Sequence, residues 1–154
     1  MAEKQLRRLK AVTTMLKLEN HELQTERVQL AQRLQELSMH ESAVASASEA
    51  VRRVEAEARG LVEADGLLSI EALAGLLQYM PGVKKQLEDA ETTLAHSETT
   101  VADSSAVVAE RHARVRGFER VQGRIARQHA EDVERVSTRE SDDLWLQRRG
   151  ADHD

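Results

Sequence analysis

Residues 9–37 have the sequence LKAVTTMLKLENHELQTERVQLAQRLQEL, in which a leucine returns at every seventh position. A repeat of seven residues keeps one seam of a helix facing a partner helix over many turns. The spacing continues beyond residue 37, so this part of the chain is predicted to be one long helix of a coiled coil. The complete row is Leu9, Leu16, Leu23, Leu30, Leu37, Val44, Val51 and Ala58.

A second row with the same spacing follows in the other half of the chain. It becomes polar at Gln122 and His129 and returns to an apolar residue at Val136. Polar residues are also expected at intermediate seam positions, where they cost stability and fix the register of the helices. The second row begins with Leu73, Met80, Leu87, Leu94, Val101, Val108 and Val115. The expected polar companions are Thr13, Asn20, Arg27, Glu41 and Ser48 in the first half, and Ser97, Ser104 and Arg111 in the second.

Between the rows lies the turn signal Glu63-Ala64-Asp65-Gly66. If the chain folds back there, Leu16 faces Val115 and Leu37 faces Leu94. The sequence therefore predicts an all-α fold, in which two long helices form an antiparallel coiled-coil hairpin as a single domain. An antiparallel dimer remains open. We expect helix 1 over about residues 2–62, a turn and tip over 63–69, helix 2 over 70–148, and a disordered tail over 150–154.

Pro81 lies inside the predicted second helix, where it removes a backbone hydrogen bond and crowds the preceding turn. The heptad row keeps its phase from Leu73 through Met80 to Leu87. A helix that is kinked or briefly broken near Pro81 and then resumes is therefore expected.

The composition favours such a coil over a globular domain. Charged residues make up 32% of the chain and aromatic residues 2%, and there is no cysteine. Chains rich in Ala, Glu, Arg and Leu with few helix breakers are typical of long helices. No run of apolar residues is long enough to span a membrane, and the sequence predicts a cytoplasmic protein.

The facing pairs predict that residues 131–149 extend past the amino terminus as an unpaired helix. Trp145 lies in this segment, and tryptophan is enriched at the centres of interfaces. Either this is a frayed end or it is a docking site for a partner. Its apolar residues are Val133, Val136, Leu144, Trp145 and Leu146.

Basic residues gather in residues 111–127, which contain six arginines and one glutamate, and in residues 1–20. The first possibility is a solvated helix surface with ordinary ion pairs. The second is a basic collar that meets an acidic ring or groove of a partner.

Motifs for catalysis are missing from the sequence. There is no phosphate-binding glycine loop, and the six histidines are scattered. The predicted register brings His21 near Glu110 and His112, but histidines on exposed helix faces are far commoner than zinc sites. We therefore expect no catalytic residues, no metal, no cofactor and no enzymatic activity.

Three stretches of this chain resemble a known family. They are the opening Leu6-Arg7-Arg8-Leu9-Lys10-Ala11-Val12, the tip Leu67-Leu68-Ser69-Ile70 with the helix through Tyr79 and Val83, and the tail Arg139-Glu140-Ser141-Asp142-Asp143-Leu144. In placement and architecture they resemble the YscO/FliJ-like (SctO) central stalk proteins of bacterial type III secretion systems. Pro81 and the small number of aromatic residues at the tip depart from that pattern.

The resemblance implies a stalk or adaptor at the cytoplasmic face of the secretion apparatus, and it favours an injectisome over a flagellum. The end with both termini would enter the pore of the hexameric secretion ATPase, and the tip would reach the cytoplasmic ring of the export gate. Some members also bind secretion chaperones. The implied ATPase-binding residues are Leu6, Arg7, Arg8, Leu9, Val12, Val133, Val136, Leu144, Trp145 and Leu146. The implied export-gate-binding residues are Leu73, Leu77, Tyr79, Met80 and Val83.

Two other functions are compatible with the sequence. One is a generic coiled-coil scaffold or chaperone-like binding protein. The other is binding of nucleic acid or an anionic surface through the arginine-rich residues 111–127, which would weaken steeply with salt. The net charge of −5 and the lack of aromatic residues among these arginines argue against nucleic acid.

Overall fold

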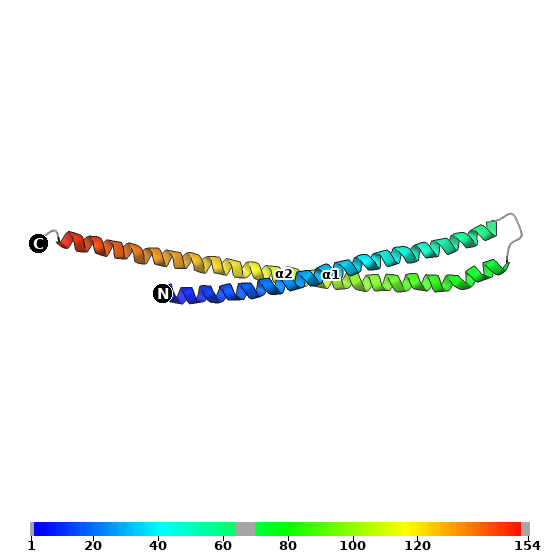
Figure 1. Ribbon diagram of the computed structural model, residues 1–154, viewed down its shortest axis with the longest axis horizontal. Helices are drawn as coiled ribbons and strands as arrows, with labels where there is room; N and C mark the ends of the chain where they lie inside the picture. Colours follow the sequence, from blue (N-terminus) through cyan, green and yellow to red (C-terminus); the bar gives the residue numbers. More distant parts are fainter. Residues whose placement is uncertain (1, 64–69, 152–154) are drawn as a thin grey trace. The chain divides into compact units, whose positions relative to one another are not determined.

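The computed structural model describes residues 2–63 and 70–151, and both stretches are helical. Helix α1 spans Ala2–Glu63 and helix α2 spans Ile70–Ala151. The fold is an all-α hairpin of two long helices that pack against each other, which confirms the predicted fold class (Figure 1). The predicted turn residues 64–69 and the last predicted tail residues, 152–154, lie outside the described residues.

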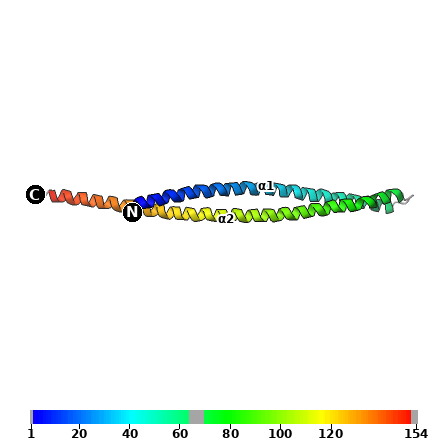
Figure 2. The same cartoon turned by 90° about the horizontal axis from the view of Figure 1, so that it is seen from below.

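The hairpin consists of two compact units. The terminal unit contains Met1–Thr25 and Val108–Asp154, and the central unit contains Glu26–Val107. In each unit a stretch of α1 lies beside a stretch of α2 that runs in the opposite direction (Figures 1 and 2).

The heptad rows form the seam in both units. Every member of the first row, from Leu9 to Ala58, is buried or half-buried, and so is every member of the second row from Leu73 to His129. Val136, the last member of that row, is exposed. Burial recurs at alternating spacings of three and four residues, as knobs-into-holes packing requires.

The companion positions were predicted correctly in α2 and incorrectly in most of α1. Ser97 and Ser104 are buried in α2, and Arg111 is half-buried. In α1 the predicted Asn20, Arg27 and Glu41 are exposed, whereas Thr13 and Ser48 are half-buried. The companion positions of α1 lie one residue earlier, at Val12, Glu19, Glu26, Arg33, His40, Ala47, Val54 and Leu61.

The pairing of the two helices differs from the predicted register by three or four residues. The prediction placed Thr13 level with Phe118, but Gln122 Nε2 donates a hydrogen bond of 2.9 Å to Thr13 Oγ1. The prediction also paired Val51 with Met80, whereas the buried cluster joins Val51 and Val54 to Val83. The predicted pairs matched the main row of one helix with the main row of the other. The buried cluster instead brings the main-row residue Val51 of α1 together with Val83, which lies at a companion position of α2.

α2 continues without interruption through Pro81, where the sequence favoured a kink or a short break. Pro81 is exposed, and so is Leu77 one turn earlier. Proline removes the hydrogen bond to the carbonyl of Leu77, and on this exposed side water can reach that carbonyl. The first turns of α2 curve within the central unit (Figure 1), which is the usual effect of a proline inside a helix.

Candidate partner-binding surfaces

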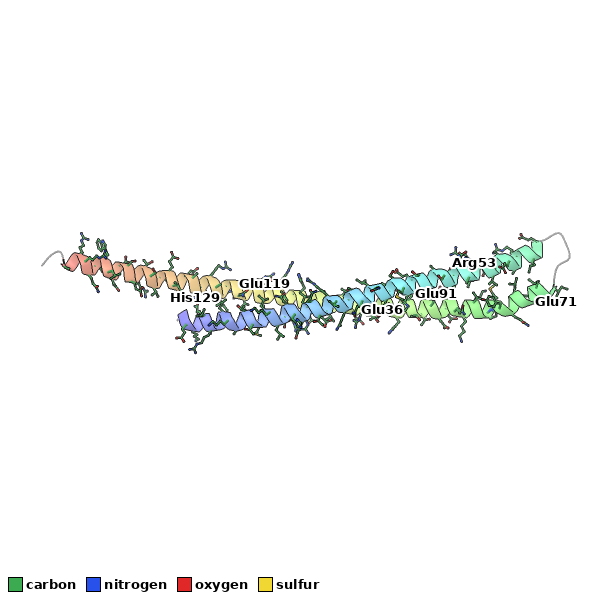
Figure 3. All side chains as sticks on the ribbon, viewed as in Figure 1. Glu36, Arg53, Glu71, Glu91, Glu119 and His129 are labelled. Atoms are coloured by element: carbon green, nitrogen blue, oxygen red, sulfur yellow. The ribbon has the colours of Figure 1, made fainter. Side chains whose placement is uncertain are left out.

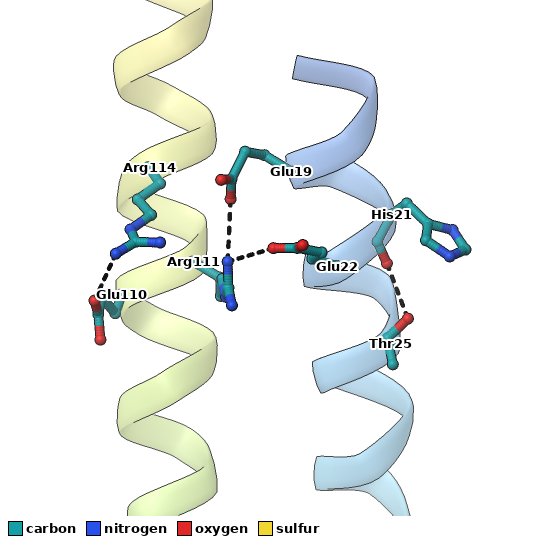
Figure 4. Close-up of polar contacts among 7 residues, drawn as sticks. All are labelled: Glu19, His21, Glu22, Thr25, Glu110, Arg111 and Arg114. Carbon is teal, nitrogen blue, oxygen red and sulfur yellow. Dashed lines mark hydrogen bonds and ion pairs between the residues drawn. The ribbon is translucent and has the colours of Figure 1, made fainter. Parts of the chain in front are cut away.

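A charged contact joins the two helices inside the terminal unit. Arg111 donates to the carboxylate of Glu19 at 3.5 Å and also forms an ion pair with Glu22 (Figure 4). Leu23 and Val115 are buried in the same unit. One of the six arginines of residues 111–127 therefore points into the seam and is not available to a partner.

Two further polar positions lie in the seam of this unit. The atoms Oε1 of Gln5 and Nδ1 of His129 are buried and have no hydrogen-bond partner among the described residues. The register set by Thr13 and Gln122 places Gln5 and His129 at the same level of the seam. Buried polar atoms without a partner cost stability, and these two atoms lie at the same end of the paired region.

The residues considered for a metal site do not come together. Glu110 pairs with Arg114 at 3.4 Å, and His21 lies on the side of α1 turned away from Arg111 (Figure 4). Within residues 2–63 and 70–151 no three side chains of His, Cys, Asp or Glu are grouped to hold a metal ion. The same stretches contain no helix that is long and apolar enough to cross a membrane.

The carboxyl-terminal part of α2 extends past the amino-terminal end of α1 (Figures 1 and 2). All residues from 133 to 151 are exposed, whereas Asp132 is still half-buried. The unpaired segment thus begins two residues later than predicted, in keeping with the shifted register. Gly150 and Ala151, which were expected in a disordered tail, belong to the helix.

The unpaired segment presents large apolar side chains to solvent. Trp145 is 57% exposed, and the guanidinium carbon of Arg149 lies 4.7 Å from the centre of its ring. This cation–π contact places the guanidinium group over one face of the indole. The exposed apolar residues of the segment are Val133, Val136, Leu144, Trp145 and Leu146.

The candidate ATPase-binding residues of α1 divide into two groups. Leu6, Arg7 and Arg8 are exposed, and Arg7 pairs with Glu3 on the same helix. Leu9 and Val12 are half-buried in the seam. Only the residues of the first group are exposed, because Leu9 and Val12 are partly covered by α2.

The candidate export-gate residues divide in the same way. Leu77 and Tyr79 are exposed, Tyr79 by 61%. Leu73 and Met80 are half-buried in the seam, and Val83 is only 2% exposed within the core of the central unit. Val83 therefore stabilises the hairpin and offers no surface to a partner in this conformation.

The central unit also contains an apolar hollow that the sequence interpretation missed. It has a volume of about 520 Å³ and lies between α1 and α2. A side-chain β-carbon at Gly60 or Gly75 would meet nothing within 4 Å, so packing within the chain does not require these glycines. Two glycines inside helical sequence were the available signal. The lining residues are Glu57, Gly60, Leu61, Ala72, Gly75 and Leu76.

Together these features define a class of protein: a two-helix hairpin with a heptad seam, an exposed apolar segment in its terminal unit and exposed apolar residues in its central unit. Comparisons with protein-family profiles, with curated proteins and with solved structures gave no match to this chain.

Proposed function

We propose that this protein is a non-enzymatic central stalk or adaptor of a bacterial type III secretion ATPase. In this proposal it works in the cytoplasm at the secretion apparatus, where it links the pore of the ATPase hexamer to the cytoplasmic ring of the export gate and assists protein export. Secretion chaperones are further expected partners.

The observation that carries the proposal is the unpaired segment of α2. It places Leu144, Trp145 and Leu146 on a helix with no partner helix beside it, all of them more than half exposed. Aromatic and aliphatic side chains in such a position are suited to anchor a partner protein. The sequence resemblance supplies the identity of that partner.

Exposure narrows the set of residues that can make the contacts. On the ATPase side we assign direct contact to Leu6, Arg7 and Arg8 and to the apolar residues of the unpaired segment. On the gate side we assign it to Leu77 and Tyr79. Leu9, Val12, Leu73, Met80 and Val83 support these surfaces from the seam.

The test is the ATPase rate of the hexamer from the same organism, measured with and without the purified chain. The wild-type chain should raise that rate, and the double change Trp145→Ala with Leu146→Ala should abolish the increase. Because both residues are exposed, circular dichroism should show unchanged helix content.

The matched control is the double change Leu77→Ala with Tyr79→Ala in the central unit. It should keep the stimulation of the ATPase and lose capture of the export-gate ring in a pull-down assay. No stimulation by the wild-type chain, together with no co-purification with the hexamer, would rule out the proposed function.

A further inference from the structure

The outer face of α2 in the terminal unit contains an arginine-lined hollow. It lies on exposed residues of the helix, around Glu119, which is labelled in Figure 3. We call this surface the arginine groove. Its residues are Arg116, Glu119, Arg120, Gly123, Arg124 and Arg127.

The arginines of the groove are not neutralised within the chain. Among the described residues no carboxylate forms an ion pair with Arg116, Arg120 or Arg124, in contrast to Arg111 and Arg114, which are both paired. Arg116, Arg120 and Arg124 follow one another at four-residue spacing, at which like charges destabilise a helix. The groove therefore holds unpaired positive charge that a partner could neutralise.

Gly123 lies within this groove. A β-carbon at this position would meet nothing within 4 Å, so packing inside the chain does not explain a glycine here. Glycine lowers helix stability relative to alanine. The missing side chain leaves a low point among the arginines, where Arg127 Nε donates a hydrogen bond of 3.3 Å to the Gly123 carbonyl and a partner helix can come close to α2.

The charge pattern around the groove favours a protein over a nucleic acid. Glu119 lies inside the groove, and Glu131 and Glu134 follow further along α2, also exposed. A uniform polyanion would be repelled at these three carboxylates. A protein segment can place its carboxylates beside the arginines and neutral residues beside the glutamates. Guanidinium groups bind carboxylates through two parallel hydrogen bonds, and the groove contains no aromatic residue on which a base could stack.

We propose that the arginine groove binds an acidic helical segment of another protein. Carboxylates spaced by three or four residues would meet Arg116, Arg120 and Arg124, and the partner helix would come closest at Gly123. This inference rests on charge and on Gly123 and does not depend on the proposed role at a secretion ATPase.

The first experiment measures binding of a fluorescent, alanine-based helical peptide with glutamate at three- and four-residue spacing to the full chain. The triple change Arg116→Gln, Arg120→Gln and Arg124→Gln should weaken binding by roughly tenfold or more, the effect of losing about one strong charged contact. The midpoint of thermal unfolding of this triple variant should be no lower than that of the parent, because the repulsion between the three arginines is removed. The control change, Arg52→Gln with Arg53→Gln, alters two exposed arginines that already pair with Glu49 and should leave binding unchanged.

The second experiment compares Gly123→Ala with Gly117→Ala. Both β-carbons have free space, so both changes should raise the midpoint of thermal unfolding. Only Gly123→Ala fills the groove, and it alone should weaken peptide binding, by about threefold or more.

Four outcomes would overturn the inference. They are no binding of the acidic peptide, equal binding of the same peptide with glutamine in place of glutamate, equal losses in the test and control variants, and tighter binding of a single-stranded RNA of equal charge. The last outcome would assign the groove to nucleic acid.

Discussion

The terminal and central units use the same heptad spacing but fill their seams differently. In the terminal unit Arg111 reaches Glu19 and Glu22 across the seam, and Gln122 bonds Thr13. In the central unit the buried cluster is apolar, built on Val51, Val54 and Val83 with Ala50, Leu76, Met80 and Leu87 packed against it. The small polar side chains of Ser97 and Ser104 are also buried in that unit, but neither forms a hydrogen bond across the seam among the described residues.

This difference separates two tasks that every coiled coil has to perform. Aliphatic layers gain stability from buried area, but they accept several alignments at similar cost. A hydrogen bond or an ion pair across the seam is satisfied in only one alignment. We infer that the central unit supplies most of the stability of the hairpin and that the terminal unit specifies its register.

The largest expected effect comes from placing a charge in the aliphatic seam. Val83→Asp should lower the free energy of unfolding by about 3–5 kcal/mol, because a carboxylate at this buried site has no partner. Circular dichroism at 222 nm would measure the loss. Hydrogen–deuterium exchange should show lost protection in the central unit, with protection kept at residues 9–23.

The control for this change is Leu77→Asp on the exposed side of the same helix, which should alter stability by no more than about 0.5 kcal/mol. If the two variants unfolded alike, or if protection vanished equally in both units, the assignment of stability to the central unit would be wrong.

A smaller effect is expected from removing the charged contact of the terminal unit. Arg111→Ala should cost about 1–2 kcal/mol, because Glu19, whose side chain is only 16% exposed, loses its partner. Thermal unfolding followed by circular dichroism would measure it. Replacing both partners, as Glu19→Leu with Arg111→Leu, should restore stability to the wild-type value or above it.

The double replacement should at the same time loosen the register. The chain has no cysteine of its own, so spin labels attach only to introduced cysteines. The exposed positions Lys17 of α1 and Arg120 of α2 are suited to them. The distance distribution between the labels should be broader in the double variant than in the parent. An equally narrow distribution in both proteins would show that Arg111 does not determine the register of the helices.

The smallest expected effect concerns a polar atom in the central unit. Ser104 is 1% exposed, and its hydroxyl has no hydrogen-bond partner among the described residues. Ser104→Ala should raise the free energy of unfolding by about 1 kcal/mol beyond the gain seen for Ser105→Ala, an exposed control that has the same change in helix propensity. Equal gains in the two variants would show that the buried hydroxyl costs nothing.

The heptad rows were sufficient to predict the two helices, because apolar spacing alone determines which side of a helix is buried. They were not sufficient for the companion positions of α1. The half-buried companion position of α1 holds Arg33, whereas the exposed position next to it holds Leu34. Counting apolar residues therefore assigns the seam to the face with Leu34, which is exposed. The long stems of Glu19 and Arg33 can lie in the seam while their charged ends reach water or a partner.

The candidate sites were less predictable than the fold. The exposure of Trp145 and its neighbours followed from the overhang, which depends only on helix lengths and register. The burial of Val83 and the accessibility of Tyr79 depend on which face of α2 meets α1, and a residue list drawn from resemblance does not contain this information. The hollow at Gly60 and Gly75 could be located only once the two helices were paired.

The polar contacts of the terminal unit also have a consequence for the order in which the hairpin forms. Arg111 and Glu19 are 92 residues apart in the chain, and Gln122 and Thr13 are 109 apart, whereas Val54 and Val83 close a far shorter loop. The entropy lost on closing a loop increases with its length, so we expect the aliphatic layers to nucleate folding and the pairing to spread from them toward the two chain ends. Each new layer then shortens the effective loop for the next, and the contacts that discriminate between alignments form last. In a chain whose helices first paired in the wrong register, Glu19 and Arg111 could not form their ion pair. Because the last turns of the helices would not yet be paired, the helices could separate and pair again in the correct register.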